Sequence, residues 1–327
     1  MDFQELIQPL PESAIFQDPN YFIWCGSLTR DDEGLFHLLY SRWPREHGFL
    51  AWVTHSEIAH ATAESPFGPF VHRDVALPER GPTYWDGHCT HNPTVIRTGG
   101  KYYLYYTGNF GDRLASSDLN WSHRNHQRVG VAVANSPYGP WTRFDQPLIN
   151  PEPGFHDALC CNNPSVTTRP EGGFLMVYKA VGDRAPLPFG GPVTHVAAIS
   201  QSPLGPFQKH PSPVFTKPGE HFPAEDPFIW AREGGYYAIV KDMDGVFTGR
   251  GRSLALFESR DGLDWKLSRH ALVSKTEIRW ENRTRQVLHA LERPQLWLED
   301  GVPRVLLCAA EFDAATSGSF NVQIPLK

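Results

Sequence analysis

Two interleaved repeats run through the chain, and repeats of this period limit the fold more than any other feature. One is the pattern SPxGP, at 65–69, 136–140 and 202–206, with a degenerate copy, SRDGL, at 259–263. Each copy follows an alternating apolar segment and precedes an aromatic residue, as a turn between two strands would. The second repeat is a proline preceded by polar residues. Its copies are Gln17-Asp18-Pro19, His91-Asn92-Pro93, Asn162-Asn163-Pro164, Glu225-Asp226-Pro227 and Glu292-Arg293-Pro294.

Five copies of the second repeat predict five structural units. A short apolar strand, a glycine-containing turn and a second strand follow the proline, as in 93–106 and 227–240. Such a unit is a small antiparallel sheet that buries its faces only against its neighbours. We therefore expect an all-β fold, a five-bladed β-propeller of four-stranded antiparallel blades, in which residues 1–327 form a single domain. One terminus should supply a strand to the terminal blade, because an open ring leaves exposed edges.

Composition limits the classes of partner. The chain has 30 basic and 36 acidic residues, and no Lys/Arg-rich run suits a phosphate backbone, so nucleic acid is not an expected partner. No long apolar stretch or leader pattern is present, which predicts no membrane partner and a cytoplasmic location, or an exported one if a leader was removed. The five cysteines lack metal-binding spacing and are expected to be buried thiols. The sequence leaves the oligomeric state open.

The second repeat also predicts a polar site. The first strand of each blade lines the channel of a propeller, so residues just before a strand-starting proline should converge at one mouth. Asp and Asn also cap turns before proline, which is the competing interpretation of any single copy. Glutamate is not a usual turn cap, so Glu225 and Glu292 favour a pocket. The expected set is Asp18, Asn92, Asn163, Glu225, Asp226, Glu292 and Arg293, with His88, His91, His156, Asp157 and Asn162 nearby.

These motifs resemble those of five-bladed propeller glycosidases, glycoside hydrolase family 43 and its relatives in families 32, 68 and 117. The resemblance implies that Asp18 is the general base and Glu225, in a segment similar to Glu-Gly-Pro, the general acid. Family 43 has an aspartate before the third-blade proline as a pKa modulator, whereas this chain has Asn163. Asp226 or Asp157 is a candidate substitute. A divalent cation on the axis, present in some relatives, stays open, and no cofactor is otherwise expected.

The chemistry can be stated from the residues alone. Cleaving a glycosidic bond needs one protonated carboxylic acid and one ionised carboxylate. Asp18 and Glu225 are the expected pair, and the resemblance favours inversion. Arg42 and Trp43 end a first-blade strand, where Trp43 would stack on a sugar and Arg42 would bind a hydroxyl or carboxylate; a packed Trp with a surface Arg is the alternative. Arg293 would anchor an anionic substrate group or pair with a neighbouring glutamate.

Three functions compete at this point. The first is an exo-acting glycoside hydrolase with an oligosaccharide substrate in an axial pocket. The second is a related phosphorylase or transferase, and the third is a non-catalytic carbohydrate-binding propeller. A second carboxylate facing Glu225 across the pocket would favour hydrolysis, and a wall of neutral Asn and His would favour binding. The segment 108–128 is predicted to be either a lid over the pocket or a subunit contact.

Overall fold

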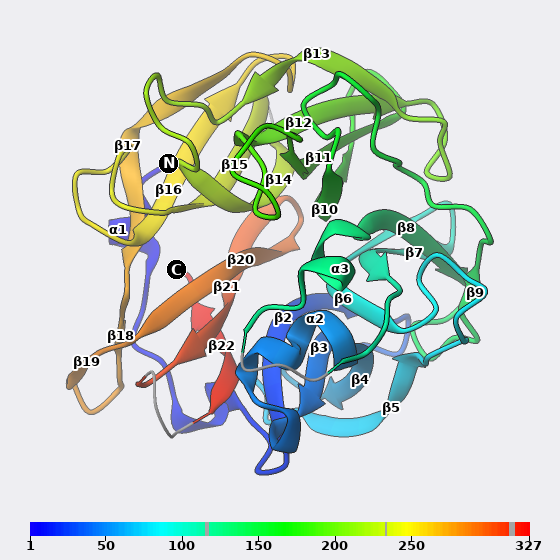
Figure 1. The fold of residues 1–327 in the computed structure, drawn as a ribbon. Coiled ribbons are helices and arrows are strands. Elements are labelled where there is room, and N and C mark those ends of the chain that lie inside the picture. The colour runs from blue at the N-terminus through cyan, green and yellow to red at the C-terminus, as the bar shows by residue number, and fades with distance from the viewer. Residues whose placement is uncertain (115–117, 233, 314–317) are drawn as a thin grey trace.

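Five four-stranded antiparallel sheets stand around a common axis (Figure 1). The computed structural model describes residues 1–114, 118–232, 234–313 and 318–327. The predicted five-bladed β-propeller is confirmed. In blades 1 to 4, consecutive strands lie side by side from the axis outward.

In each blade four strands follow one another from the axis outward. Blade 1 consists of β2 (Tyr21–Arg30), β3 (Phe36–Pro44), β4 (Glu57–Ala63) and β5 (Val71–Leu77). Blade 2 consists of β6 (Cys89–Thr98), β7 (Lys101–Asn109), β8 (Arg128–Ala134) and β9 (Thr142–Arg143). Blade 3 consists of β10 (Cys160–Thr168), β11 (Phe174–Val181), β12 (Val193–Ser200) and β13 (Gln208–Val214). Blade 4 consists of β14 (Ala224–Arg232), β15 (Gly235–Asp242), β16 (Ser253–Ser259) and β17 (Trp265–Lys275). Blade 5 consists of β20 (Ala290–Glu299), β21 (Val302–Glu311), β22 (Ser319–Pro325) and β1 (Ile15–Phe16).

The remaining elements are short. They are the hairpin β18 (Glu277–Arg279) and β19 (Arg285–Val287), the α-helices α1 (Phe3–Leu6), α2 (Trp52–His55) and α3 (Trp121–Asn125), and 3-10 turns at Glu12–Ala14, Arg45–His47 and Phe49–Ala51. No helix among the described residues is long and apolar enough to cross a membrane. All five cysteines are buried and free, as predicted.

The N-terminus closes the ring. Strand β1 pairs antiparallel with β22, with Ile15 opposite Val322 and Phe16 opposite Asn321. The last blade is therefore built from both ends of the chain, which confirms the expected terminal strand. This pairing covers the outer edge of β22, and Phe16 of β1 packs in the apolar cluster between the last and first blades.

The core lies between blades, as the repeat predicted. Each of the five blade interfaces has its own apolar cluster. Between blades 2 and 3, for example, Tyr105 and Val131 pack with Val166 and Met176. The SPxGP copies are the turns between the third and fourth strands of blades 1 to 3, and SRDGL is the same turn in blade 4.

Every innermost strand carries a β-bulge at the same position. The bulged residue has a positive φ, between 47° and 56°, and the five are Cys25, Asn92, Asn163, Asp226 and Arg293. In blades 2 to 5 a proline follows, and the strand begins three or four residues before that proline. The expectation that the proline starts the strand is therefore wrong. A bulge interrupts the ladder, which allows proline inside an inner strand.

The bulges also correct the first copy of the second repeat. The blade 1 counterpart of Asn92 is Cys25, followed by Gly26 instead of proline, and not Asp18. Asp18 lies in the connection between β1 and β2, where its Oδ1 accepts a hydrogen bond from the Asn20 backbone N–H at 2.7 Å. It caps a turn, which was the competing interpretation of this motif.

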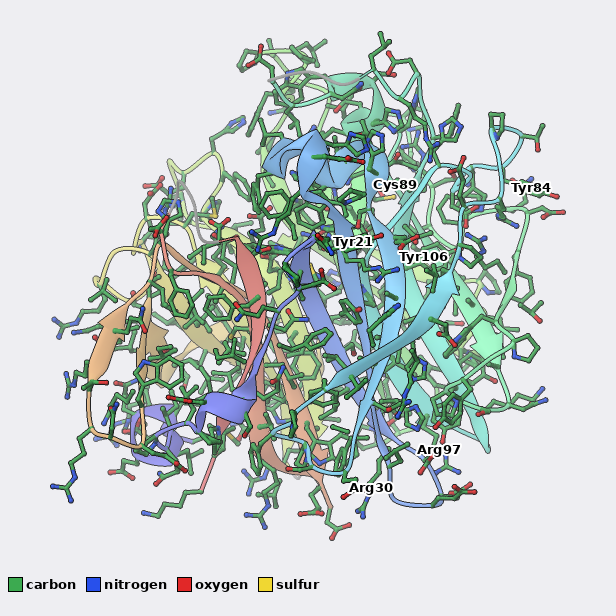
Figure 2. All side chains as sticks on the ribbon, turned by 90° about the horizontal axis from the view of Figure 1, so that it is seen from below. Tyr21, Arg30, Tyr84, Cys89, Arg97 and Tyr106 are labelled. Carbon is green, nitrogen blue, oxygen red and sulfur yellow. The ribbon has the colours of Figure 1, made fainter. Side chains whose placement is uncertain are left out.

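Inner strands of neighbouring blades run in the same direction. In Figure 2, Tyr21 and Cys89, at the starts of β2 and β6, lie toward the end of the molecule that carries α2, and Arg30 and Arg97 lie toward the other end. The bulges of all five blades are close to the strand starts, so their side chains meet near the α2 end of the axis.

Candidate active site

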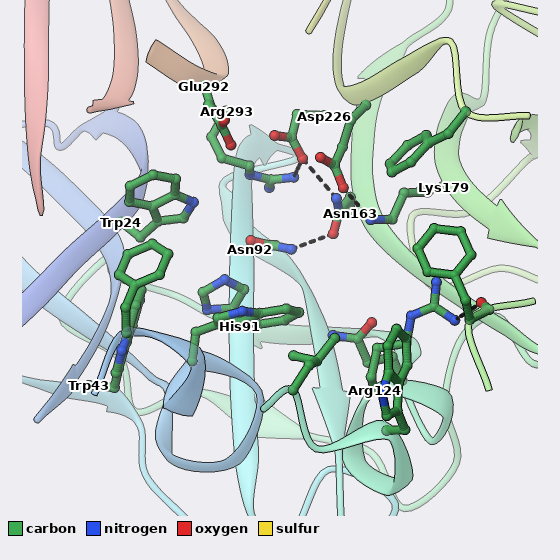
Figure 3. A pocket seen from close by; sticks show the side chains of 18 residues that line it. Trp24, Trp43, His91, Asn92, Arg124, Asn163, Lys179, Asp226, Glu292 and Arg293 are labelled. Carbon is green, nitrogen blue, oxygen red and sulfur yellow. Dashed lines mark hydrogen bonds and ion pairs between the residues drawn. The ribbon is translucent and has the colours of Figure 1, made fainter. Parts of the chain in front are cut away.

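A cavity of about 260 Å³ opens on the axis above the bulges (Figure 3). This volume is near the lower limit of ligand pockets, about 300–1,000 Å³. All five blades and the segments between them contribute to its wall. The lining residues are Trp24, Trp43, Phe49, Trp52, His91, Asn92, Leu119, Trp121, Arg124, Gln127, Asn163, Lys179, Phe189, Phe222, Glu225, Asp226, Glu292 and Arg293.

The bulged residues form a chain of hydrogen bonds across the axis. The Cys25 thiol donates to Asn92 Oδ1 at 2.8 Å, and Asn92 Nδ2 donates to Asn163 Oδ1. Asn163 Nδ2 and Arg293 Nη1 both donate to Asp226 Oδ1 at 2.8 Å. All five side chains are buried, so the chain of polar contacts seals the bottom of the cavity. The positive φ at each bulge turns these side chains toward the axis.

The carboxylates of the cavity gather on the side of blades 4 and 5. One oxygen each from Glu225, Asp226 and Glu292 lies within 4.8 Å of the others. Lys241, on β15, binds both glutamates, with its Nζ 2.6 Å from Glu292 Oε1 and 3.4 Å from Glu225 Oε2. Lys179, on β11, donates to the other Glu225 oxygen. Three carboxylates therefore face three cations, counting Arg293 on Asp226.

The two glutamates differ in pKa, because Glu225 contacts two lysines and Glu292 only one. Burial acts to raise the pKa of Glu225, but Lys179 and Lys241 outweigh it and hold that pKa well below its usual range. Burial also raises the pKa of Glu292; Lys241 opposes this, while Asp226 and Glu225 add to it, and the pKa ends above its usual value. The pKa values of two carboxyls in one cluster are thus shifted in opposite directions.

Aromatic side chains and a neutral histidine form the wall of blades 1 and 2. His91 packs against Trp43 and Trp52, with ring centroids 5.8 and 5.2 Å away, and one of its nitrogens lies 2.7 Å from Ser56 Oγ. Burial, and then the charges of Arg293 and Lys179, lower the pKa of His91 well below its usual value. Among the described residues, this wall carries no carboxylate.

The structure brings most of the expected site residues together. Of the sequence-predicted residues, those that line the cavity are Trp43, His91, Asn92, Asn163, Glu225, Asp226, Glu292 and Arg293. Arg293 is ion-paired with Asp226, an aspartate, and not with a neighbouring glutamate as expected. Those that do not line the cavity are Asp18, Arg42, His88, His156, Asp157 and Asn162.

Each residue outside the cavity has a local partner. Arg42 binds Glu57 at 2.9 Å and covers the Tyr21 ring. Asp157, fully buried, accepts from the Tyr178 hydroxyl and from Lys209, so it ties inner and outer strands of blade 3 together.

The other three also contact protein groups. His88 Nδ1 accepts from the Gly111 backbone N–H, and His156 Nε2 is 3.0 Å from the Pro211 carbonyl oxygen. Asn162 stands one step back from the cavity, where it donates to Gln127 Oε1.

Sequence reasoning missed several cavity residues. Lys179 and Lys241 lie opposite Asn162 and Glu225 in the strand ladders. Two blades have a lysine at the same register, near the end of an otherwise apolar second strand. This pattern could have identified both lysines as site residues from the sequence. Trp121 and Arg124 come from the segment 108–128, and the described part of that segment does contribute to the wall. Residues 115–117 of it lie outside the described residues.

A divalent cation does not fit this carboxylate cluster as it stands. Glu225, Asp226 and Glu292 are close enough together to bind one ion. Each is already paired with Lys179, Lys241 or Arg293, which neutralise the charge a divalent cation would need. Binding would require the ammonium groups to leave a buried site.

Comparison with known proteins places the fold. No protein-family model matches the chain. Sucrose-6-phosphate hydrolase of Streptococcus mutans is 24% identical over 185 residues, which are 52% of this chain and only 33% of that protein.

Solved structures match over nearly the whole chain. A family 117 glycoside hydrolase from Zobellia galactanivorans aligns with a TM-score of 0.67 and 20% identity, over 100% of this chain and 92% of that one. A thermostable family-43 glycoside hydrolase aligns with a TM-score of 0.65 and 14% identity, over 98% and 92%. The predicted resemblance to five-bladed glycoside hydrolases is confirmed for the fold, which is what such identities establish.

Proposed function

We propose that the protein is a glycoside hydrolase that cleaves a sugar from the end of an oligosaccharide in the axial cavity. The observation that carries this proposal is the pair of glutamates whose acidities differ within one cluster. Groups pushed apart in pKa are the usual sign of an acid and a base at work. The solved structures with the same fold are glycoside hydrolases, which is consistent with this reading.

In this proposal Glu292 is the general acid and Glu225 the ionised carboxylate. Of the two glutamates Glu292 has the higher pKa, which makes it the better proton donor to the departing oxygen. Glu225 is kept ionised by Lys179 and Lys241 and is the nucleophile at the anomeric carbon. Glu225 was expected to be the general acid, and this proposal gives that role to Glu292. Asp18, the expected general base, has no catalytic role in it. Asp226 accepts hydrogen bonds from Asn163 and Arg293 and so holds these side chains in place at the bottom of the cavity, beneath the sugar.

The separation of the two glutamates supports retention of configuration. Their nearest oxygens are within 4.8 Å. Carboxyls about 5–5.5 Å apart are typical of retaining enzymes, and inverting enzymes keep about 6.5–9.5 Å for a water molecule. The inversion expected from the resemblance is therefore not the outcome this geometry favours.

The shape of the cavity supports exo action. The chain of polar contacts from Cys25 to Arg293 seals one end, so a ligand enters from the other. The aromatic residues of blades 1 and 2 offer flat faces for stacking on a sugar ring.

The test is hydrolysis of a panel of oligosaccharides and aryl glycosides by wild type, Glu225→Gln, Glu292→Gln and the control Asp18→Asn. Loss of the acid should reduce kcat about 10²–10⁴-fold on natural linkages. The loss should be much smaller for aryl glycosides, whose leaving group needs no proton. Glu225→Gln should be inactive on both, and Asp18→Asn should keep activity. Equal activity of Glu225→Gln and wild type would refute the assignment, and NMR of the first product anomer checks retention.

A second function, sugar binding without catalysis, is favoured by one observation. The described wall facing Glu225 across the cavity consists of aromatic residues and neutral His91 and has no carboxylate. Sugar binding in calorimetry, together with no turnover on any substrate of the panel, would establish this alternative.

A further inference from the structure

Among the described residues that line the cavity, Arg124 is a cation with no carboxylate partner. Lys179, Lys241 and Arg293 are all ion-paired with Glu225, Asp226 or Glu292. Arg124, on α3, also lines the cavity, but no described carboxylate lies within 4 Å of it, and only 7% of the residue is exposed. Arg124 therefore adds a positive charge to a site in which the other three cations are each paired with a carboxylate.

The guanidinium of Arg124 is held in place by uncharged groups. Its Nη1 donates to the Phe189 carbonyl oxygen at 2.8 Å and to Asn125 Oδ1 at 2.9 Å. The rings of Trp121 and Phe189 lie 5.6 and 5.5 Å from its central carbon. These contacts orient the group but leave its charge uncompensated. A nearly buried charge without a counter-ion is unfavourable unless a ligand supplies one.

The unused donors of Arg124 are open to the cavity. Nε and Nη2 have no described acceptor, and neither atom is sealed inside the protein. This edge of a guanidinium is a planar pair of N–H donors that matches the two oxygens of a carboxylate, sulfate or phosphate. In Figure 3, Arg124 lies across the cavity from Glu292 and Arg293.

We propose that Arg124 binds an anionic substituent on the sugar, so that the protein takes acidic saccharides, uronates or sulfated sugars, in preference to neutral ones. The proposal deepens the function proposed above and rests on the same cavity. The same donors would also bind free phosphate, and the inorganic phosphate arm of the experiment below distinguishes the two sources of the anion. The role expected of Arg293 therefore falls to Arg124.

The test measures binding, so it does not depend on turnover. Calorimetry compares galacturonic acid, galactose 6-sulfate, galactose and inorganic phosphate on wild type, Arg124→Gln, Arg124→Lys and Arg128→Gln. Arg128 is a matched control, because it bonds the carbonyl oxygens of Asn125 and Gln127 and does not line the cavity.

For wild type we expect at least one acidic sugar to bind about tenfold or more tightly than galactose. The preference should vanish in Arg124→Gln, persist in part in Arg124→Lys and be unchanged in Arg128→Gln. It should weaken as salt rises. A merely structural role for Arg124 would reduce binding of neutral and acidic sugars alike.

Other outcomes would overturn the proposal. Equal affinity for galactose and both acidic sugars in wild type, or an acidic preference that survives Arg124→Gln, excludes Arg124 as the anion-binding residue. Arg124-dependent binding of inorganic phosphate without binding of acidic sugars excludes a sugar-borne anion and favours phosphorolysis. Acidic-sugar binding without hydrolysis would keep this inference and contradict only the proposed catalysis.

Discussion

At the scale of single residues, Lys179 and Lys241 set the difference in pKa between the two glutamates of the cavity. Burial acts to lower the pKa of Lys241, but Glu225 and Glu292 outweigh burial and raise it, so Lys241 stays an ammonium ion. It touches both glutamates, yet Glu225 has a second lysine, Lys179, and Glu292 does not. This asymmetry accounts for the opposite pKa shifts of the two glutamates.

Removing this charge should move the pH profile of hydrolysis upward. Lys241 lowers the pKa of both glutamates, so Lys241→Met raises both. Glu292 then keeps its proton to higher pH, and the alkaline limb of kcat/KM shifts up. Glu225 takes up a proton more readily, so the acidic limb shifts up as well. Lys266→Met, an exposed lysine on β17, is the control. An unchanged profile in Lys241→Met would contradict the assignment.

At the scale of elements, the bulges of blades 2 and 3 each need a partner for the backbone N–H that leaves the ladder. The preceding blade provides one: the Asn92 N–H donates to Ser41 Oγ and the Asn163 N–H to Thr107 Oγ1, both at 3.0 Å. Strands β3 and β7 thereby hold the bulges of β6 and β10. These contacts link blade packing directly to the polar floor of the cavity.

Thr107→Val tests how much the hydrogen bond from the Asn163 N–H to Thr107 Oγ1 contributes to stability. The change keeps the shape of the side chain but leaves the buried Asn163 N–H without an acceptor, which costs about 1–3 kcal/mol. We expect the free energy of unfolding in urea to fall by that amount. Thr107→Ser keeps the hydroxyl and should stay closer to wild type. Equal stability of the two variants would show that the hydrogen bond is unimportant.

At the scale of the whole molecule, the N-terminus ties blades 4 and 5 together. Beyond the pairing of β1 with β22, Phe3 on α1 is fully buried and meets Trp230 of β14 edge to face at 6.4 Å. It belongs to the apolar cluster between these two blades. The first residues of the chain therefore complete blade 5 and also fill the interface between blades 4 and 5.

Phe3→Ala should destabilise the whole propeller and not only its N-terminus. Removing a buried phenylalanine costs about 3–5 kcal/mol, because it leaves a cavity in the core. Thermal unfolding should remain one transition at a lower temperature. Val287→Ala, at a position that is 76% exposed, is the control and should change little. A Phe3→Ala variant as stable as this control would mean that α1 does not contribute to ring closure.

The sequence by itself determined the number of blades, the turns between their outer strands and four of the five axial motifs. These features are local: a proline, a glycine turn and a run of alternating apolar residues lie within a few positions of one another. The motif of blade 1 was placed at the wrong residues. Its bulged residue is Cys25, which is followed by Gly26 instead of proline, whereas Asp18-Pro19 has the sequence of the motif but lies in a turn. Only the bulge in β2 showed the true register.

The tertiary structure alone decided the charges of the cavity. Lys179 pairs with Glu225 across 46 positions of sequence, and Arg293 pairs with Asp226 across 67. Such pairings depend on how blades meet around the axis, and no local pattern encodes them. The same is true of Arg124, which belongs to a segment without a repeat. Its place in the wall follows from the packing of α3 against the loop that contains Phe189.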